Sequence, residues 1–319
     1  MSESKTDALR DLVSAYPATA AIVETTLKVW PEHAAYLLKS FSPRTPAMMR
    51  ATEAAAAASA KLMAGDEETV AADYRWTCDR LREEELFFHR EGRYRLSTFA
   101  EADAEVYSDH AYMGRYVNGL LLTQVLWYNH AATFEMFLNE VLGGAKAPFD
   151  YLEVGPGHGL MVYFAAQSHL CQQLQAWDVS AVSLRETRAA LAKLGLTKPV
   201  ALVETDILSA DRPTQAFDLI VISEVLEHLE TPARALRFLR DALKDEGRIF
   251  INVPLNSPSP DHIYLFETPD DVKALVQSAG LKIESLSLFA TQGRAIESAL
   301  ANRITVSAGV VARPIQEAS

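Results

Sequence analysis

The chain has little cysteine, no long apolar run and no excess of positive charge. Cys78 and Cys171 are its two cysteines in 319 residues, too few for a disulfide framework or a zinc cluster. No run approaches 18 apolar residues, so no membrane-spanning helix is expected. The N-terminus MSESKTDALRD also has no apolar signal core. We therefore expect a cytoplasmic protein with no membrane partner.

Acidic residues outnumber basic ones across the chain. There are 42 Asp and Glu residues against 30 Lys and Arg, which gives a formal net charge of -12. This balance argues against nucleic acid or an anionic membrane as the main partner, although a local basic cleft is still compatible with it. Hydrophobic residues make up 49% of the chain and charged residues 23%, as in an ordinary globular protein of one large or two smaller domains.

A glycine-rich turn lies near the middle of the chain, in the stretch FDYLEVGPGHG. Phe149–Val154 is a short apolar run with one acid, Glu153, and it predicts a buried parallel strand. The turn that follows contains Gly155, Pro156, Gly157 and Gly159. An apolar run with helical character, residues 160–166, comes next. Strand, glycine turn and helix open a nucleotide-binding βαβ unit, because glycine lets a ligand lie against the backbone.

The spacing of these glycines is G-x-G-x-G rather than the G-x-G-x-x-G of dinucleotide enzymes, which argues against a dehydrogenase. An ordinary strand-to-helix turn is the alternative. With Glu153 placed two residues before the first glycine, the stretch resembles the first motif of class I S-adenosylmethionine-dependent methyltransferases. The resemblance implies that Glu153 and the glycine turn bind S-adenosylmethionine.

Strands and helices alternate regularly after the turn. Five β–α alternations followed by two strands predict a doubly wound, mostly parallel, seven-stranded α/β sheet of Rossmann-like type. The later strands are expected at 174–177, 200–204, 217–222, 248–253, 281–288 and 304–311, and the helices at 181–194, 232–243 and 268–279.

Acidic residues follow two of these strands. Asp178 ends the second strand, where a carboxylate can accept hydrogen bonds from both hydroxyls of a ribose. Asp206 follows the third strand, and the resemblance implies that it pairs with the adenine amine, although a turn residue would look the same. We expect three neighbours of these strand ends to complete the cofactor site: Val179, Ile207 and Ser223.

The run FDLIVISEVLEHL, the later Pro254-Leu255-Asn256 and His262 are similar to the subgroup that includes the ubiquinone-biosynthesis O-methyltransferases. The matching segments, about residues 145–312, look like a complete class I methyltransferase domain. The resemblance implies methyl transfer from S-adenosylmethionine to a small molecule, with secondary metabolism as the expected setting. Oxygen is the first expectation for the acceptor atom, and nitrogen or carbon are the alternatives.

Three residues are candidates for the catalytic step. His228 follows Glu224 by four residues, which places both on one face if the segment is helical. His228 can act as a general base or contact the acceptor, or it can simply hold the loop in place. His262 lies in a later loop that can fold over the same site.

Glu224, Glu227, His228 and His262 also resemble the divalent-metal set of small-RNA 2′-O-methyltransferases and some ubiquinone-pathway enzymes. Two carboxylates and two imidazoles suit Mg²⁺, Mn²⁺ or Zn²⁺. The motif E-x-x-E-H is shared widely in this subgroup, including by members that resemble metal-free enzymes. We therefore favour a metal-free site, and the metal ligands stay unknown.

The sequence predicts that the first half of the chain is mainly helical. Pro17 and Pro31 divide residues 4–40 into short helices, and a helix from about residue 65 to 85 precedes a hairpin predicted at Leu86–His89 and Arg93–Ser97. Helix and hairpin suggest a winged helix, but the acidic helix would repel DNA. The order of elements instead resembles the dimerisation domain of small-molecule O-methyltransferases, which implies a homodimer.

The predicted domain boundary follows a helical stretch at 112–142 that is expected to break near Gly119. Residues 1–144 are then a helical, winged-helix-like substrate and dimerisation domain, and residues 145–319 bind S-adenosylmethionine. Two other classes compete with an enzyme: a winged-helix regulator that senses S-adenosylmethionine, and a pseudoenzyme. The acidic helix argues against the regulator, and the intact acids Glu153, Asp178 and Asp206 argue against the pseudoenzyme.

Overall fold

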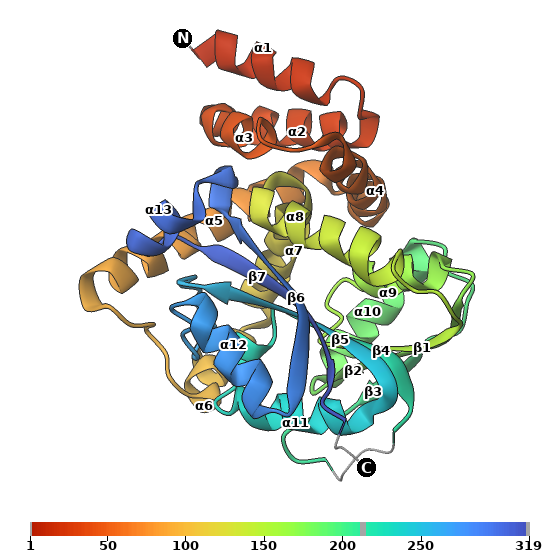
Figure 1. The fold of residues 1–319 in the computed structure, drawn as a ribbon. Helices are drawn as coiled ribbons and strands as arrows, with labels where there is room; N and C mark the ends of the chain where they lie inside the picture. The colour runs from red at the N-terminus through yellow and green to blue at the C-terminus, as the bar shows by residue number, and fades with distance from the viewer. Residues whose placement is uncertain (1, 211–214, 317–319) are drawn as a thin grey trace. The chain divides into compact units, whose positions relative to one another are not determined.

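The computed structural model describes residues 2–210 and 215–316 (Figure 1). These residues form two compact units. The helical unit comprises the chain up to Glu135 together with Asn256–Leu265 and Phe289–Ser307, and the sheet unit comprises Met136–Leu255, Phe266–Leu288 and the chain from Ala308 onward. The division predicted after residue 144 was continuous in sequence, whereas two segments from the second half of the chain belong to the helical unit.

Seven strands of the described residues form one sheet, in the order β3-β2-β1-β4-β5-β7-β6. The strands are β1 (Phe149–Val154), β2 (Cys171–Asp178), β3 (Ala201–Glu204), β4 (Phe217–Ser223), β5 (Leu243–Leu255), β6 (Leu281–Ala290) and β7 (Val306–Pro314). β1 pairs in parallel with β2 and β4, β2 with β3, and β4 with β5. The predicted doubly wound, mostly parallel fold is confirmed. The strand order reverses between β1 and β4, where such sheets bind ligands at their carboxyl ends.

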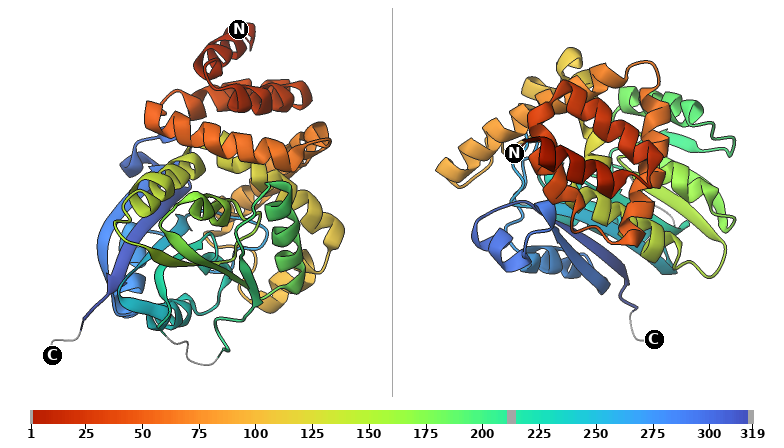
Figure 2. Two further views of the ribbon diagram at one scale, coloured as in Figure 1. Left: turned by 90° about the vertical axis from the view of Figure 1, so that its right-hand side faces the viewer. Right: turned by 90° about the horizontal axis from the view of Figure 1, so that it is seen from above.

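Helices cover the sheet. They are α9 (Leu160–Gln167), α10 (Ala181–Lys193), α11 (Pro232–Ala242) and α12 (Pro269–Ser278), with short turns η3 (Phe137–Leu142) and η4 (Leu226–His228). α9 packs on β1 and β2, α10 on β2 and β3, and α11 on β5; Figure 2 gives further views of these layers. Ile220, Val221 and Ile222 of β4 are fully buried, as expected for a parallel strand covered on both faces.

The helical unit begins with helices whose starts are set by proline. Pro17, Pro31 and Pro46 occupy first positions, where the missing N–H has no intrahelical partner to lose. The elements are α1 (Ser2–Val13), α2 (Pro17–Val29), η1 (Pro31–His33), α3 (Ala34–Phe41), α4 (Pro46–Met63), α5 (Glu67–Glu91), α6 (Phe99–Ala102), η2 (Asp103–Tyr107), α7 (His110–Leu126), α8 (Tyr128–Met136), η5 (Thr291–Gly293) and α13 (Ile296–Ala301). Among the described residues, none of the helices has the length and apolar character needed to cross a membrane.

The predicted hairpin, which had suggested a winged helix, is wrong. Leu86–His89 lie in the last turns of α5, which ends at Gly92 in the left-handed conformation (φ 72°), a helix cap rather than a hairpin turn. The aromatic run suggested a strand, but Phe88 is fully buried from the helix and its ring lies 5.6 Å from that of Tyr94. Arg93–Ser97 form no strand in the described structure. The helical unit is therefore not a winged helix in this region.

The expected break near Gly119 is also misplaced. α7 runs through Gly119 and ends at Leu126, because Trp127 adopts an extended conformation (φ −96°, ψ 135°). Gly119 serves packing instead: a Cβ atom there would lie 2.1 Å from Thr77 Oγ1 of α5. The glycine lets α5 and α7 approach closely, and this pair is one of the most extensive contacts of the helical unit.

Arg44 is a buried cation in the helical unit, with 8% of its surface exposed. Its Nε donates to Ser40 O at 3.1 Å, and its Nη1 donates to Val125 O and Thr52 Oγ1, each at 2.9 Å. Ser40 and Val125 lie in the last turns of α3 and α7, where carbonyl groups lack helical partners and carry partial negative charge. Two helix ends thus stabilise the guanidinium, although burial lowers the pKa of Arg44 to about 9.

Candidate cofactor and acceptor site

The glycine turn after β1 requires its glycines. Gly155, Gly157 and Gly159 have φ values of 67°, 50° and 69°, a region that side chains disfavour. A Cβ at Gly155 would lie 2.5 Å from Val225 Cγ2, in the loop after β4, whereas a Cβ at Gly157 would meet nothing within 4 Å. The turn therefore packs on the β4 loop at one end and leaves backbone open to a ligand in its middle.

Hydrogen bonds from backbone and side chain fix this turn at the carboxyl end of the sheet. Gly155 N donates to Trp177 O of β2 at 2.9 Å, and Gly159 N donates to Pro156 O at 2.7 Å. Thr187 Oγ1 of α10 donates to Gly157 O at 2.7 Å. The turn is thus held from β2 and from α10, so its shape exists before any ligand arrives.

Glu153, near the end of β1, is a buried acid with 5% of its surface exposed. Tyr151 OH donates to its Oε2 at 2.9 Å, and the backbone N–H of Val162 also donates to it. Its neighbours on the adjoining strands are apolar, Ala176 on β2 and Val221 on β4. Burial raises the pKa of Glu153 to about 8, because a low-dielectric site disfavours the charged carboxylate.

We expect Glu153 to make the stability of the chain depend on pH. Its pKa rises from an ordinary 4.5 to about 8 on folding, so the folded chain binds this proton more tightly than the unfolded chain. The resulting stabilisation is complete below pH 4.5 and is lost as pH rises towards 8. The loss should be on the order of 1–4 kcal/mol.

Chemical unfolding of the wild type and of Glu153→Gln, measured across this pH window, checks the expectation. The glutamine keeps an oxygen that can accept from Tyr151 but does not titrate. The difference in unfolding free energy between the two chains should therefore shrink or reverse with rising pH. Parallel curves for the two chains would show that Glu153 is not responsible.

Asp178 ends β2 as predicted. Its Oδ1 accepts from Ser180 N at 2.8 Å and its Oδ2 accepts from Ser183 Oγ at 2.7 Å. Each carboxylate oxygen can accept a further bond, so these contacts orient the group and still allow it to bind hydroxyls. Burial raises the pKa of Asp178, and the two serine donors oppose that shift. Val179 beside it is 56% exposed.

Asp206 forms the turn after β3. Its Oδ1 accepts from Leu208 N at 2.8 Å and its Oδ2 from Ser209 Oγ at 2.7 Å. Thr205 N donates to Asp178 O at 2.9 Å, which ties this turn to the end of β2. Ile207 is buried. The turn role considered for Asp206 is thus present, and its contact with adenine stays a prediction.

Ser223 and Glu224 stand at the end of β4, beside an asparagine that sequence reasoning missed. Asn252 Nδ2, on β5, donates to Ser223 Oγ at 3.0 Å and to Glu224 Oε1 at 2.8 Å. Glu224 N donates to Asn252 O at 2.9 Å. Asn252 has only 3% of its surface exposed. A polar residue inside the apolar run IFINVPL was the available signal.

The condition under which Glu224 and His228 would share a helical face is not met, because the segment that joins them is not a continuous helix. Glu224 has φ 54°, and η4 covers only Leu226–His228. The reason is that β4 continues to Ser223 and its pairing with β5 extends through Glu224 N. Left-handed backbone at a residue other than glycine costs of order 1–3 kcal/mol and is concentrated at functional sites.

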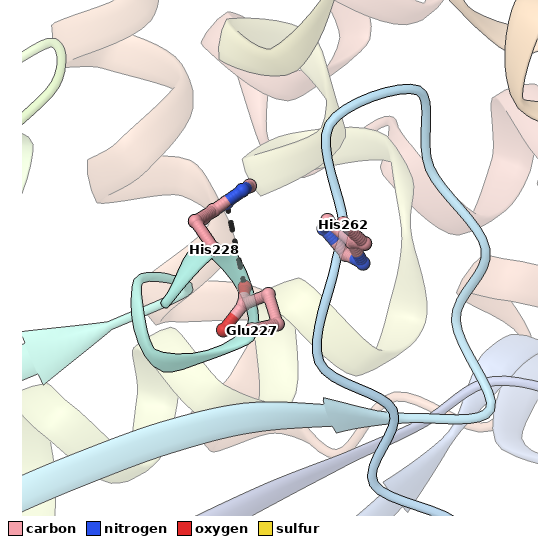
Figure 3. A group of neighbouring side chains, drawn as sticks. All are labelled: Glu227, His228 and His262. Carbon is pink, nitrogen blue, oxygen red and sulfur yellow. Dashed lines mark ion pairs between the residues drawn. The ribbon is translucent and has the colours of Figure 1, made fainter. Parts of the chain in front are cut away.

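His228 is accessible while its neighbour is not. The His228 side chain is 22% exposed, the Glu227 side chain is fully buried, and His228 Nε2 lies 3.8 Å from Glu227 Oε1 (Figure 3). Glu224, Glu227 and His228 belong to the sheet unit and His262 to the helical unit, so the four-residue metal set stays a prediction from the resemblance.

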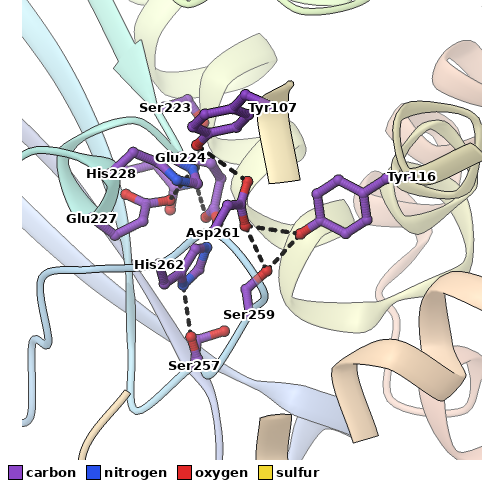
Figure 4. A network of polar contacts seen from close by, with 11 residues as sticks. Tyr107, Tyr116, Ser223, Glu224, Glu227, His228, Ser257, Ser259, Asp261 and His262 are labelled. Atoms are coloured by element: carbon purple, nitrogen blue, oxygen red, sulfur yellow. Dashed lines mark hydrogen bonds and ion pairs between the residues drawn. The ribbon is translucent and has the colours of Figure 1, made fainter. Parts of the chain in front are cut away.

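His262 lies in the loop at 256–265 and is buried, with 7% of its surface exposed. Its Nδ1 is 2.7 Å from Ser257 O (Figure 4). A carbonyl oxygen only accepts, so Nδ1 carries the proton and the neutral ring has its lone pair on Nε2. That nitrogen is the one able to accept a hydrogen bond or a proton.

The comparisons with known proteins agree with this architecture. Residues 152–249 match the family model described as a methyltransferase domain. The ubiquinone biosynthesis O-methyltransferase of Xanthomonas euvesicatoria pv. vesicatoria (strain 85-10) is 24% identical over 165 residues, which cover 46% of this chain and 66% of that relative. The match therefore spans slightly less than two thirds of the relative's length.

Solved structures share the fold at low identity. The mitomycin 7-O-methyltransferase MmcR is 16% identical with a TM-score of 0.50, over 78% of this chain and 71% of that chain. The [4+2]-cyclase SpnF is 18% identical with a TM-score of 0.48, over 59% of this chain and 83% of that chain. The likeness to MmcR shows a shared fold and nothing beyond it.

Residues 152–249 therefore match a methyltransferase domain, the class of domain for which S-adenosylmethionine is the expected methyl donor. This confirms the resemblance inferred from the sequence. The glycine turn, Asp178 and the strand order at β1 and β4 fit such a cofactor, since they offer open backbone and an oriented carboxylate at the ligand-binding edge of the sheet.

Proposed function

We propose that the chain transfers the methyl group of S-adenosylmethionine to an oxygen atom of a small molecule. One observation carries the proposal. Three groups stand at the carboxyl ends of β1, β2 and β4: an open glycine turn, an oriented carboxylate, and an acid that accepts a hydrogen bond from an asparagine side chain. These are Gly157, Asp178 and Glu224. This edge adjoins the point where the strand order reverses, and ligands bind there in open α/β sheets.

The cofactor is proposed to lie with its methionine end along Gly155–Gly159 and its ribose on Asp178. Asp206 then takes the adenine amine, and Val179 and Ile207 flank the ring. Ser223 contacts the methionine end from β4. Glu153 supports this end from within β1, where it is too buried to reach far into solvent. The exposed apolar side chain of Val179 supports its place beside a flat aromatic base.

Methyl transfer requires mainly that the acceptor oxygen and the methyl group be held in line at attack distance. The sulfonium loses its positive charge in the transition state, so a carboxylate against it would stabilise the reactants more than the transition state. We therefore assign Glu224, held by Asn252, to orienting the acceptor. His228 and His262 are the proposed proton acceptors for its hydroxyl.

Oxygen is proposed because the curated relative is an O-methyltransferase, and secondary metabolism is the proposed setting. The test is to incubate the chain with S-adenosylmethionine labelled with carbon-13 at the methyl group and panels of phenols, alcohols, amines and activated carbons. The carbon-13 shift of the product identifies the atom that received the methyl. A labelled N-methyl or C-methyl product would reject oxygen. Cofactor binding without any product would favour a sensor or pseudoenzyme.

We also propose that the helical unit carries a homodimer contact. Large apolar side chains are exposed on it, including Leu12 at 41%, Leu86 at 65% and Phe99 at 44%. Light scattering at micromolar concentration should give twice the mass of one chain, and Leu86→Glu should shift the population towards one chain. A wild-type monomer at that concentration would refute the proposal.

A further inference from the structure

The loop at 256–265 is tied to the N-terminal part of the helical unit by tyrosines. Tyr116, on α7, places its hydroxyl 2.5 Å from Ser259 Oγ and 3.1 Å from Asp261 Oδ1. Ser259 Oγ donates to Asp261 Oδ1 at 2.9 Å. Figure 4 shows these side chains pointing toward one another. A single helix residue thus holds two residues of the loop.

Counting protons gives the direction of these bonds. Burial and the charge of Asp261 raise the pKa of Tyr116 well above its usual range, so the phenol keeps its proton. Ser259 gives its proton to Asp261, and Tyr116 gives its own to Ser259, the nearer acceptor. Tyr107 OH donates to Asp261 Oδ2 at 3.4 Å. Chained hydroxyl bonds of this kind strengthen one another in a low-dielectric interior.

A second tyrosine acts at the start of the loop. Tyr94 OH accepts from Ser257 N at 3.1 Å, and Ser257 O accepts from His262 Nδ1 at 2.7 Å. The rings of Tyr94 and His262 meet edge-on, with centroids 5.9 Å apart. Ser257 is therefore held at both its backbone N–H and its backbone carbonyl, and the carbonyl fixes the orientation of the imidazole.

We infer that Tyr94 and Tyr116 are positioning residues of the acceptor site. They hold the loop at 256–265 in the arrangement in which Ser257 O accepts from His262 Nδ1, so that the imidazole keeps its proton on Nδ1. This inference rests on the proposed function, since it concerns the histidine that would accept the hydroxyl proton. It gives two residues of the N-terminal half a part in turnover beyond dimerisation.

Tyr116→Phe removes one oxygen and tests the inference. Turnover should fall about 10- to 100-fold, because small displacements of a reacting group are costly, while the affinity for S-adenosylmethionine stays unchanged. Tyr112→Phe, four residues earlier on α7, is the matched control and should keep turnover within about twofold. If Tyr116→Phe does not fold, Ser259→Ala breaks the same hydrogen-bond chain at its middle.

A second readout does not depend on turnover. Nitrogen-15 spectra of the histidine rings, with the His262 signals assigned from His262→Asn, report which ring nitrogen carries the proton. We expect a proton on Nδ1 in the wild type and in Tyr112→Phe, and a mixture of tautomers in Tyr94→Phe and Tyr116→Phe. A merely structural role of the tyrosines would lower stability without changing the tautomer.

Two results would overturn the inference: a wild-type ring with its proton on Nε2, or Tyr116→Phe with unchanged turnover and unchanged tautomer. Failure of the proposed function looks different. In that case the wild type yields no O-methylated product, yet the spectra still show how the tyrosines affect His262.

Discussion

Replacing His228 by alanine should lower turnover by roughly two to four orders of magnitude, the range expected for loss of a general base. Binding of S-adenosylmethionine should persist, because the glycine turn and Asp178 lie on other strand ends. Steady-state kinetics and calorimetry on the same variant separate the two effects. His169→Ala, at an exposed histidine of the same unit, is the control and should behave like the wild type.

The same variant addresses the metal question. In the metal-free site that we favour, a chelator leaves turnover unchanged, and Glu227→Gln does not reproduce the defect of His228→Ala. If a divalent ion acts instead, the chelator abolishes turnover, added metal restores it, and loss of Glu224 or Glu227 is as damaging as loss of His228. Turnover that is lost to chelator and restored by metal would contradict our preference.

Asp178→Ala should weaken binding of S-adenosylmethionine by roughly 1–3 kcal/mol, the cost of leaving ribose hydroxyls unpaired in a buried site. Two serine contacts orient this carboxylate in advance, so little of the binding free energy is spent on ordering it. Ser183→Ala is the matched control: it removes one orienting bond and keeps the carboxylate, and its effect should be smaller.

Calorimetric titration of each variant gives these affinities, and thermal unfolding shows whether the chains are folded. Equal affinity of Asp178→Ala and the wild type would remove Asp178 from the site. A larger loss in Ser183→Ala than in Asp178→Ala would show that the serine, not the acid, is the ligand.

The sheet unit could be predicted because its signals are local. The buried strand Phe149–Val154, its glycine turn and the following helix are each specified by neighbouring residues, and the structure places them as expected. The helical unit gave weaker signals. The aromatic run around Phe88 suited a strand as well as a helix, and only burial against Tyr94 in the folded chain decides between them.

The identities of the candidate site residues could be predicted, but their supporting partners could not. Asn252 bonds to Glu224 across 28 residues, and Tyr116 bonds to Ser259 across 143 residues. No periodicity links such pairs, because strand pairing and loop packing bring them together. The backbone strain at Glu224 was hidden for the same reason: it depends on the hydrogen bond between its N–H and β5.

Calorimetric titration of the full wild-type chain with S-adenosylmethionine, and separately with NAD⁺, tests the central claim most directly. The open turn at Gly155–Gly159 and the carboxylate of Asp178 predict saturable binding of S-adenosylmethionine, one molecule per chain, and no heat with NAD⁺. Saturable binding of NAD⁺ with none of S-adenosylmethionine would contradict the account.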